Sequence, residues 1–478
     1  MAVDYPFLCA GQWRNGLLTE PSTNPYTGEI VASASQASAE DVDDATAAAV
    51  EAFKVTRKQS AFERSSILMR VAEGLGRERE QLARLMVSDI GKPIRFCRSE
   101  VDRSVQTFTW AAEESKRFGG EYMPLDAIAQ SVGYHSITRR FPLGPIAGVC
   151  PFNFPINLAA HKFAPAIATG NTIVLKPPPQ GPLCTLELAR IVEEAGVEPG
   201  SVSVLPCAVD VAGGLVADER YKLLSFTGSP EVGFALKSEA GKKHVVLELG
   251  GNAGAIVHDD ADIEWAAKRL ALGAFANAGQ VCISVQRIYV HRPIFERFTA
   301  MFLEQTGLLK TGDPEDDETV VGPLIDDSAA FRIKEWIKEA EAGGAKTLAG
   351  GEWIGPRTLT PTVFTDADPD LKIVCEEVFG PVVILDSYDI FSDAIDAVND
   401  SRYGLQAGVF TKNIDNIWQA FNHLDMGAVI VNDYPTFRVD QMPYGGVKDS
   451  GRGKEGVRYA MDSMTEERLV VFRTSDAG

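Results

Sequence analysis

The sequence predicts an α/β protein with parallel sheets that is divided into more than one domain. The chain has 478 residues, too many for one hydrophobic core, and its 45% hydrophobic content is that of an ordinary globular protein. From residue 145 onward, short apolar strands alternate with helical segments. This alternation is typical of βαβ units, in which helices cover both faces of a parallel sheet. A second α/β segment follows the glycine pair at 250–251 and continues to about residue 445.

The first 118 or so residues are expected to form an opening β ribbon followed by helices. Ser38 and Asp41 have the spacing of a capping box, and apolar residues recur behind them at helical intervals. A longer helical run is expected from Phe62 until the stretch Gly-Lys-Pro at 91–93 ends it.

The strands of the first α/β segment are expected in IAGVC, TIVLK, VSVLP, KLLSFT and HVVLEL, with helices between them. The second segment should contain strands in GAIV and SVQRIYV, a helix over 262–277 between them, and a further helix near PIFERFTAMFLEQTG. Two stretches, SVGYHSITRRFPLG at 131–144 and ERLVVFRT near the end, look like isolated ribbons. Since isolated ribbons are marginally stable, we expect these two to pair with each other or with another subunit.

Charge and composition exclude several classes of partner. The chain carries 46 basic and 66 acidic residues, and the formal net charge of -20 repels nucleic acid and anionic membrane surfaces. The opening MAVDYPFLCAGQWRNG lacks the basic and apolar regions of a signal peptide, so a cytoplasmic location is expected. The 7 cysteines include no close C-x-x-C pair, which favours neither a disulfide framework nor a zinc site. Most of them should be reduced core thiols.

One cysteine does not fit that description. Cys282, in ANAGQVCISV, follows a helix-breaking Asn-Ala-Gly at the point where the chain turns into a strand. A loop in this position exposes the sulfur and brings backbone N–H groups close to it. A free thiol at neutral pH is only a few per cent thiolate, so a nucleophilic cysteine needs a site that stabilises its anion.

Four polar features fall at the carboxyl ends of the predicted strands, where open parallel sheets bind their ligands. Asn153 follows IAGVC within PFNFP, and Lys176 ends TIVLK. Gly228 and Ser229 follow KLLSFT, and Glu248 ends HVVLEL just before the glycine pair at 250–251. We expect these four features to surround one crevice.

Each feature also has a purely structural interpretation. Burial among aliphatic residues raises the pKa of Glu248 toward that of a general base, but a glutamate there can also cap a helix or pair with a lysine. The Gly228 turn suits a pyrophosphate, although such turns also open ordinary helices. Lys176 alone fits a solvated strand end. The Asn153 amide, aimed by rigid neighbours, can stabilise an oxyanion, whereas a single asparagine is more often an Asx-turn residue.

Seven motifs taken together are far more specific than any one of them. PFNFP, TIVLKP, SFTGS, LELGG, GQVC, EEVFGP and PYGGVKDSG occur in this order. From NPYTGE near residue 24 to the final strand, the sequence resembles the NAD(P)-dependent aldehyde dehydrogenase superfamily. The resemblance implies a Rossmann-type parallel-sheet cofactor domain at 1–120 and 143–250, and a second α/β catalytic domain at 251–445. It also implies a small β oligomerisation arm at 121–142 and 463–478, assembly as a homodimer or homotetramer, and no resident metal.

The resemblance also implies a reaction, in which a small aldehyde is oxidised to its carboxylic acid with NAD(P)+. Cys282 would be the nucleophile and would hold the acyl group as a thioester. Glu248 would activate the water that releases the acid. Asn153 would share the oxyanion with the backbone N–H of Cys282, and one such donor is typically worth roughly 3 to 4 kcal/mol.

The implied cofactor contacts follow from the same motifs. Lys176 would contact the adenosine ribose, Glu377 of EEVFGP the nicotinamide ribose hydroxyls, and Gly228 the pyrophosphate. The complete predicted set is Phe152, Lys176, Pro179, Gly228, Ser229, Leu249, Gly250, Glu377 and Phe379. Many members carry a glutamate three residues after the strand lysine, but here that position is Pro179. With no carboxylate to exclude a 2'-phosphate, NADP should be accepted at least as readily as NAD.

The substrate is predicted only by class. PFNFP, GQVCISVQR and MPYGGVKDSG look most like the lactaldehyde and non-phosphorylating glyceraldehyde-3-phosphate branch, which handles small, often hydroxylated or anionic aldehydes. The predicted substrate contacts are Phe154, Val281, Ile283 and Arg438. Arg438 would meet an anionic substituent; alternatively it is a surface arginine or part of a subunit salt bridge.

Three other classes of function stay open at this point. A thiol hydrolase could use Cys282, Asn153 and Glu248, but it would have no need of Lys176 or Glu377. A CoA-acylating dehydrogenase would pass the thioester to CoA, whereas the presence of Glu248 favours water. A non-catalytic protein on this scaffold would be expected to have lost Cys282 or Glu248, and both are present.

Overall fold

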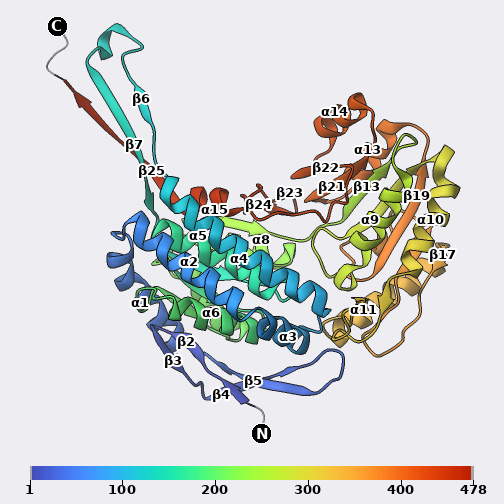
Figure 1. The fold of residues 1–478 in the computed structure, drawn as a ribbon, viewed down its shortest axis with the longest axis horizontal. Coiled ribbons are helices and arrows are strands. Elements are labelled where there is room, and N and C mark those ends of the chain that lie inside the picture. The colour runs from blue at the N-terminus through green and yellow to red at the C-terminus, as the bar shows by residue number, and fades with distance from the viewer. Residues whose placement is uncertain (1–2, 475–478) are drawn as a thin grey trace.

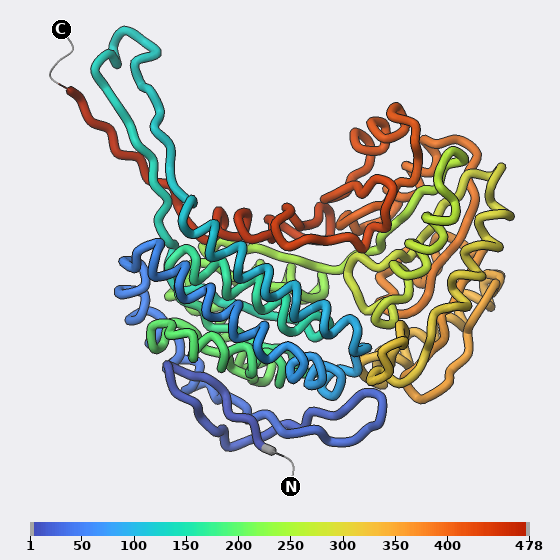
Figure 2. The backbone as a smooth tube through the Cα atoms, in the orientation of Figure 1, coloured from blue at the N-terminus to red at the C-terminus, as the bar shows by residue number. Residues whose placement is uncertain are grey.

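The computed structural model describes residues 3–474, which form two α/β lobes and a projecting arm (Figure 1). The arm leaves the first lobe as a long ribbon, along which the last labelled strand, β25, runs (Figures 1 and 2). The last four residues of the predicted arm, 475–478, lie outside the described residues. In the described part of the chain, no helix is both long and apolar enough to span a bilayer.

The first lobe is built on an eight-stranded sheet with the order β24-β12-β11-β8-β9-β10-β2-β3. Its centre is parallel, as the alternating pattern predicts, and consists of β8 (Pro145–Val149), β9 (Thr172–Lys176), β10 (Val202–Val204), β11 (Leu223–Thr227) and β12 (His244–Glu248). Antiparallel pairing adds β2 (Phe7–Cys9), β3 (Gln12–Arg14) and β24 (Gly451–Arg452) at the edges. The carboxyl ends of the central strands therefore meet at one edge of the lobe.

Helices cover this sheet. They are α1 (Ala39–Thr56), α2 (Ala61–Arg77), α3 (Arg79–Ile90), α4 (Ile94–Arg117), α5 (Pro155–Thr169), α6 (Leu183–Glu194), α7 (Val209–Ala217) and α8 (Pro230–Glu239). The predicted capping box of Ser38 and Asp41 opens α1. The expected single run from residue 62 is wrong, because the chain leaves helical geometry at Glu78 (φ -99°, ψ 14°) and forms α2 and α3 instead. Gly91, at φ 67°, then ends α3.

The second lobe contains a seven-stranded sheet with the order β17-β18-β19-β14-β13-β21-β22. Its strands are β13 (Ala253–Val257), β14 (Val285–His291), β17 (Lys346–Ala349), β18 (Thr362–Thr365), β19 (Val382–Tyr388), β21 (Gln406–Phe410) and β22 (Ala428–Val431), all parallel apart from β17. Its principal helices are α9 (Ile263–Phe275), α10 (Phe295–Gly307), α11 (Asp327–Ala342), α13 (Phe391–Asn399) and α14 (Ile414–His423). The predicted helix over 262–277 is confirmed, with Asp262 as its N-cap, but it ends at Phe275.

The arm is a three-stranded antiparallel sheet of β6 (Tyr122–Pro124), β7 (Tyr134–Pro142) and β25 (Thr465–Arg473). The two ribbons predicted from the sequence pair with each other, from Tyr134 opposite Arg473 to Pro142 opposite Thr465. The elements not yet named are β1 (Val3–Tyr5), β4 (Leu18–Thr23), β5 (Ile30–Gln36), β15 (Lys310–Thr311), β16 (Thr319–Val321), β20 (Tyr403–Gly404), β23 (Val447–Lys448), α12 (Lys372–Cys375) and α15 (Val457–Ser463), with 3-10 turns η1 (Ala129–Ser131), η2 (Ala276–Gly279) and η3 (Arg292–Ile294).

Candidate active site

A cavity of about 610 Å³ lies at the carboxyl ends of the first-lobe strands, and residues of both lobes line it. The lining includes Asn153 after β8, Gly228 and Ser229 after β11, Glu248 at the end of β12, and Cys282 from the second lobe. Of the sequence-predicted site residues, it also contains Phe152, Phe154, Leu249, Gly250, Val281, Ile283, Glu377, Phe379 and Arg438. The fold therefore brings together residues that are far apart in the sequence.

Lys176 and Pro179 do not line this cavity. Lys176 ends β9, and β8 separates that strand from β11 and β12. Its ammonium donates to the carbonyl of Pro177 at 3.3 Å, and burial lowers its pKa. Pro179 is exposed on the loop that follows. Of the four polar features, three line the cavity, and Lys176 lies one strand beyond them because β9 follows β8 in the sheet; its role in cofactor binding stays a prediction.

The backbone in front of Cys282 is held in an uncommon conformation. Asn277 (φ 54°), Ala278 (φ 54°) and Gly279 (φ 67°) are all left-handed, and the first two carry side chains. A left-handed backbone conformation costs a residue other than glycine about 1 to 2 kcal/mol. Tertiary contacts must therefore hold this turn in place. A side chain at Gly279 would collide with the carbonyl of Gly380. The Asn-Ala-Gly sequence thus turns the chain sharply and presents Cys282 to the cavity.

The sulfur of Cys282 lies 2.9 Å from the hydroxyl of Tyr444. Burial raises the pKa of the Cys282 thiol to about 11, and the Tyr444 hydrogen bond and the positive charge of Arg438 oppose this rise. Val281, Ile283, Leu405 and Tyr444 form an apolar cluster around the sulfur. The free thiol is therefore protonated at neutral pH, and it needs anion-stabilising groups to react as a nucleophile.

Glu248 has the buried environment that its sequence predicts. It is 3% exposed, and neither of its carboxylate oxygens has a hydrogen-bond partner within residues 3–474. Burial, followed by the nearby negative charge of Glu455, raises the pKa of Glu248 well above its ordinary value, while Arg438 lowers it. Such a carboxylate is a stronger base than an exposed one, and its oxygens are free to bind water.

Asn153 is anchored by a buried ion pair that the sequence analysis does not identify. The ammonium of Lys92 lies 2.5 Å from Glu100, donates to the backbone carbonyl of Asn153 at 3.0 Å, and sits 3.5 Å above the ring of Phe154. Glu100 in turn accepts from the first backbone N–H groups of α5. The side-chain amide of Asn153 donates to the carbonyl of Gln280 at 3.1 Å, which leaves its second N–H available.

The other end of the cavity fits a dinucleotide. Gly250 has no side chain and lines this end of the cavity with its backbone. A Cβ at this position would collide with the carboxylate of Glu377. Glu377 accepts from the backbone N–H of Gly251 at 2.8 Å, and burial raises its pKa to about 7. The rings of Phe152 and Phe379 lie edge to face with centroids 6.0 Å apart. Carboxylate, aromatic face and bare backbone are the groups that a ribose and a nicotinamide need.

Gly228 and Ser229 open helix α8, as the sequence predicts. The Ser229 side chain accepts from the backbone N–H of Val232 at 3.4 Å, and Pro230 occupies the first turn. A side chain at Gly233 would lie 2.5 Å from Leu249, so this glycine allows the helix to approach the β12 loop closely. Gly228 and Ser229 line the cavity, so the positive end of the α8 dipole lies beside it and favours a phosphate.

Comparison with known proteins decides between the remaining interpretations of this site. The family model described as "Aldehyde dehydrogenase family" matches residues 13–470. The chain belongs to the aldehyde dehydrogenase family. The match covers both lobes and the arm, so this aldehyde dehydrogenase is an NAD(P)-dependent oxidoreductase of mixed α/β fold.

Individual relatives support the predicted branch of the family. The 3-sulfolactaldehyde dehydrogenase of Priestia megaterium is 43% identical over 469 residues, which cover 98% of each chain. The structure of aldehyde dehydrogenase 21 from Physcomitrella patens in complex with the reaction product succinate has a TM-score of 0.97 at 42% identity, covering 100% of this chain and 99% of that one. The structure of the glyceraldehyde-3-phosphate dehydrogenase GapN of Methanocaldococcus jannaschii, complexed with NADP, has a TM-score of 0.92 at 37% identity. This match covers 96% of this chain and 100% of that one.

Cationic side chains surround the aldehyde dehydrogenase cavity beside Cys282. Arg438 is neither on the surface nor free, since its side chain is 8% exposed and lies 3.0 Å from Glu455 of the same chain. Its guanidinium stacks 3.7 Å from the Tyr444 ring, and its Nε has no hydrogen-bond partner within the described residues. Arg103 and Arg269 also line the cavity, paired with Asp440 and Asp433 respectively.

Several of these residues were missed by sequence reasoning. Tyr444 lies inside the quoted motif PYGGVKDSG, but nothing local marks it as a partner of Cys282, 162 positions away. Lys162 donates to Ser225 and Thr227 and approaches Glu455 at 3.5 Å. A signal for it existed, because a lysine within the otherwise apolar segment INLAAHKFAPAIATG must be buried and therefore paired.

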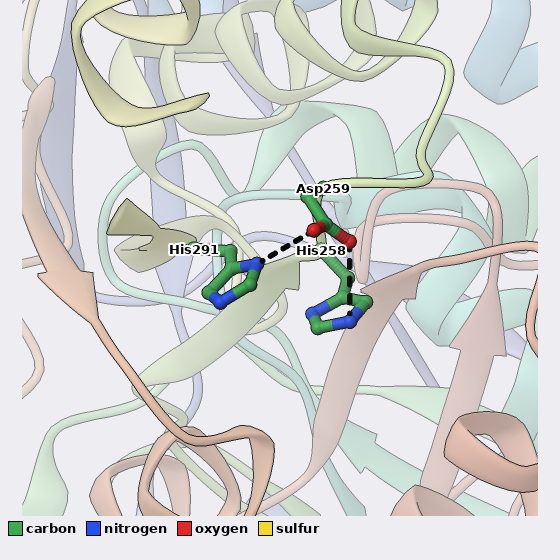
Figure 3. Close-up of side chains that lie close together, drawn as sticks. All are labelled: His258, Asp259 and His291. Carbon is green, nitrogen blue, oxygen red and sulfur yellow. Dashed lines mark ion pairs between the residues drawn. The ribbon is translucent and has the colours of Figure 1, made fainter. Parts of the chain in front are cut away.

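A second group of polar side chains lies in the second lobe, where His258, Asp259 and His291 meet (Figure 3). Each histidine places one ring nitrogen 3.3 Å from one oxygen of Asp259. The rings stack at 4.6 Å with 14° between their planes, and His291 also stacks on Tyr388. Because ring-nitrogen lone pairs lie in the ring planes, one ion could not lie in both planes without rotation of a ring. The stack itself accounts for this cluster.

Proposed function

We propose that this aldehyde dehydrogenase oxidises a small aldehyde with an anionic substituent to its carboxylic acid. The observation that carries the proposal is the set of groups that line one cavity. They are the sulfur of Cys282, the carboxylate of Glu248, which has no hydrogen-bond partner within residues 3–474, the amide of Asn153 and the guanidinium of Arg438. These groups are a nucleophile, a base, an oxyanion donor and a cation.

In the proposed mechanism, the thiol of Cys282 first loses its proton to water, and the thiolate then attacks the carbonyl carbon and gives a tetrahedral alkoxide. The second N–H of the Asn153 amide donates to this oxygen. When bound, the nicotinamide accepts the hydride that this oxidation releases. Cys282 then holds the acyl group as a thioester. Glu248 takes a proton from water, the resulting hydroxide displaces the sulfur, and the acid leaves.

The anionic substituent is inferred from Arg438 and from the relatives. The Nε–H of the buried guanidinium has no partner within the described residues, and a carboxylate, sulfonate or phosphate oxygen would satisfy it. One relative is named for 3-sulfolactaldehyde, and the structure of another was determined in complex with the reaction product succinate. Phe154, Val281 and Ile283 would enclose the short carbon chain between that group and the sulfur.

For the cofactor, we propose that NADP is used at least as readily as NAD. Pro179 offers no carboxylate against a 2'-phosphate, and the Lys176 ammonium is near enough to the loop to bond the carbonyl of Pro177. Ratios of kcat/KM for the two cofactors test this proposal, and a strong preference for NAD would contradict it. Glu377, Phe379, Phe152, Leu249, Gly250, Gly228 and Ser229 would hold the rest of the dinucleotide.

Two substitutions test the roles of the nucleophile and the base. Cys282→Ala should abolish aldehyde-dependent NADPH formation while cofactor binding survives, and Cys375→Ala, which removes a thiol outside the cavity, should leave turnover intact. Glu248→Gln should give a burst of about one NADPH per active site and then stall, because in the proposed mechanism Glu248 acts only after the thioester has formed. Undiminished steady turnover of the Glu248→Gln variant would exclude Glu248 as the deacylation base.

We further propose that the arm joins copies of this chain into a homodimer or homotetramer. Its outer strand β25 has an unpaired edge and exposes Leu469, Val470, Val471 and Phe472 by 43 to 55% each. An exposed apolar strand edge favours pairing with another chain. Phe472→Glu should lower the mass measured by light scattering; an unchanged mass would contradict this. The domain division is also a proposal: a cofactor domain at 1–120 and 143–250, a catalytic domain at 251–445, and the arm at 121–142 and 463–478. We propose a cytoplasmic location as well.

A further inference from the structure

The hydrogen bond between Cys282 and Tyr444 has a definite direction once the thiol is ionised. The Tyr444 hydroxyl is buried, and the sulfur of Cys282, at 2.9 Å, is its one hydrogen-bond partner within residues 3–474. In the neutral pair either group can donate, but a thiolate has no hydrogen to give. The hydroxyl therefore donates to the ionised sulfur. This donation strengthens when the sulfur is charged, since hydrogen bonds to ions are roughly twice as strong as neutral ones.

The Tyr444 side chain cannot easily move away from the sulfur. Its backbone forms a bridge with Glu455, with N–H···O distances of 3.0 Å and 2.6 Å in the two directions. The guanidinium of Arg438 covers its ring at 3.7 Å and is itself held by Glu455 at 3.0 Å. A positive charge on the ring face draws electron density from the phenol oxygen, so the hydroxyl becomes a better donor.

We propose that Tyr444 is a positioning residue that stabilises the thiolate of Cys282 and aims its sulfur into the cavity. This inference rests on the proposed role of Cys282 as nucleophile. The ring supplies the cavity wall, and the hydroxyl supplies the donor that the buried anion otherwise lacks. A hydrogen bond to a charged group changes an ionisation equilibrium by roughly tenfold to a hundredfold. The fraction of reactive thiolate at neutral pH should depend on this one hydroxyl by that factor.

The direct test is the pH dependence of Cys282 alkylation in the full-length Tyr444→Phe variant. Phenylalanine keeps the ring under Arg438 and removes only the oxygen. Neutral iodoacetamide is added between pH 6 and 11, and mass spectrometry follows the peptide that contains Cys282. We expect the half-point of reactivity to rise by one pH unit or more and the rate at pH 7.5 to fall about tenfold or more. Tyr434→Phe is the matched control, since its ring lies 3.8 Å from the Arg269 guanidinium in the same cavity.

A second measurement separates a positioning role from a merely structural one. The thiolate absorbance at 240 nm, taken as the difference from Cys282→Ala, should titrate at higher pH in Tyr444→Phe than in the wild type. Aldehyde oxidation by Tyr444→Phe should be impaired most at neutral pH and recover toward the wild-type rate near pH 10. An unchanged or lowered half-point in either titration would overturn the proposal. Both titrations need no aldehyde, so they stand apart from the test of Cys282 as nucleophile by turnover.

Discussion

Replacement of Arg438 by methionine tests how this enzyme recognises its substrate. Methionine keeps much of the side-chain volume and removes the charge. Arg438 is buried at 8% exposure and pairs with Glu455 at 3.0 Å, and its Nε has no hydrogen-bond partner in the part of the chain that the structure describes. We expect the KM of an anionic aldehyde to rise in this variant and the KM of a neutral aldehyde to be spared.

The magnitude follows from what each substrate loses. A charge-assisted hydrogen bond contributes about 1.5 to 3 kcal/mol, so kcat/KM for the anionic aldehyde should fall roughly tenfold to a hundredfold more than for the neutral one. A second effect is common to both substrates. Arg438 lowers the pKa of Glu248, and its removal leaves more of the base protonated and slows deacylation in every case. This shared effect cancels when the loss of kcat/KM for the anionic aldehyde is divided by the loss for the neutral one.

Succinic semialdehyde and butanal form a suitable pair, because both have four carbons and only the first carries a carboxylate. Initial rates over a range of each aldehyde, with saturating NADP, give kcat and KM separately. Arg269→Met is the matched control, since it removes a cavity arginine that already makes a two-pronged pair with Asp433. Equal losses of kcat/KM on both aldehydes in Arg438→Met would remove Arg438 from the substrate site.

Three further outcomes are expected. Lys92→Met should lower the free energy of unfolding by about 3 to 5 kcal/mol in urea denaturation, because it leaves Glu100 buried without its cation; a loss below about 1 kcal/mol would contradict this. Burial raises the pKa of Glu377, the proposed ligand of the ribose hydroxyls, to about 7; since a carboxylate accepts from hydroxyls best when ionised, cofactor affinity measured by calorimetry should weaken as pH falls from 8 to 6. In Glu377→Gln this slope should vanish. Pro179→Glu should reduce kcat/KM for NADP at least tenfold relative to NAD, since like charges would meet at the 2'-phosphate; an unchanged ratio would place the phosphate elsewhere.

The parts of this fold that could be predicted from the sequence depend on local patterns. The capping box at Ser38 is confirmed because both partners lie within one turn. The placement of Asn153, Gly228 and Glu248 at one edge is confirmed because strands of a parallel sheet end on the same side. The motifs around Cys282 gave the family, which the comparisons then confirmed.

The parts that could not be predicted depend on geometry between distant segments. The break at Glu78 has no proline to mark it, and the nearby glycines, Gly74 and Gly76, lie within α2 itself, so the apolar period runs through the break. Lys176 lies outside the cavity because of strand order, which alternation does not determine. Tyr444 and Glu455 come from irregular segments between short strands, where no periodicity indicates which way a side chain points. Their roles follow only from contacts with Arg438 and Cys282.

Contacts between these distant segments join Glu248, the proposed base, and Arg438, in the proposed substrate site, into one network of charges. Glu248 and Glu455 are both buried, and their environments push their pKa values apart. Lys162 and Arg438 hold the pKa of Glu455 at about 2, while burial and the negative charge of Glu455 raise that of Glu248. Such a separation is the usual condition for one carboxylate to act as a base while its neighbour stays ionised. Arg438 thus serves Glu455 and the proposed substrate anion at once, so a change at this residue should alter specificity and deacylation together.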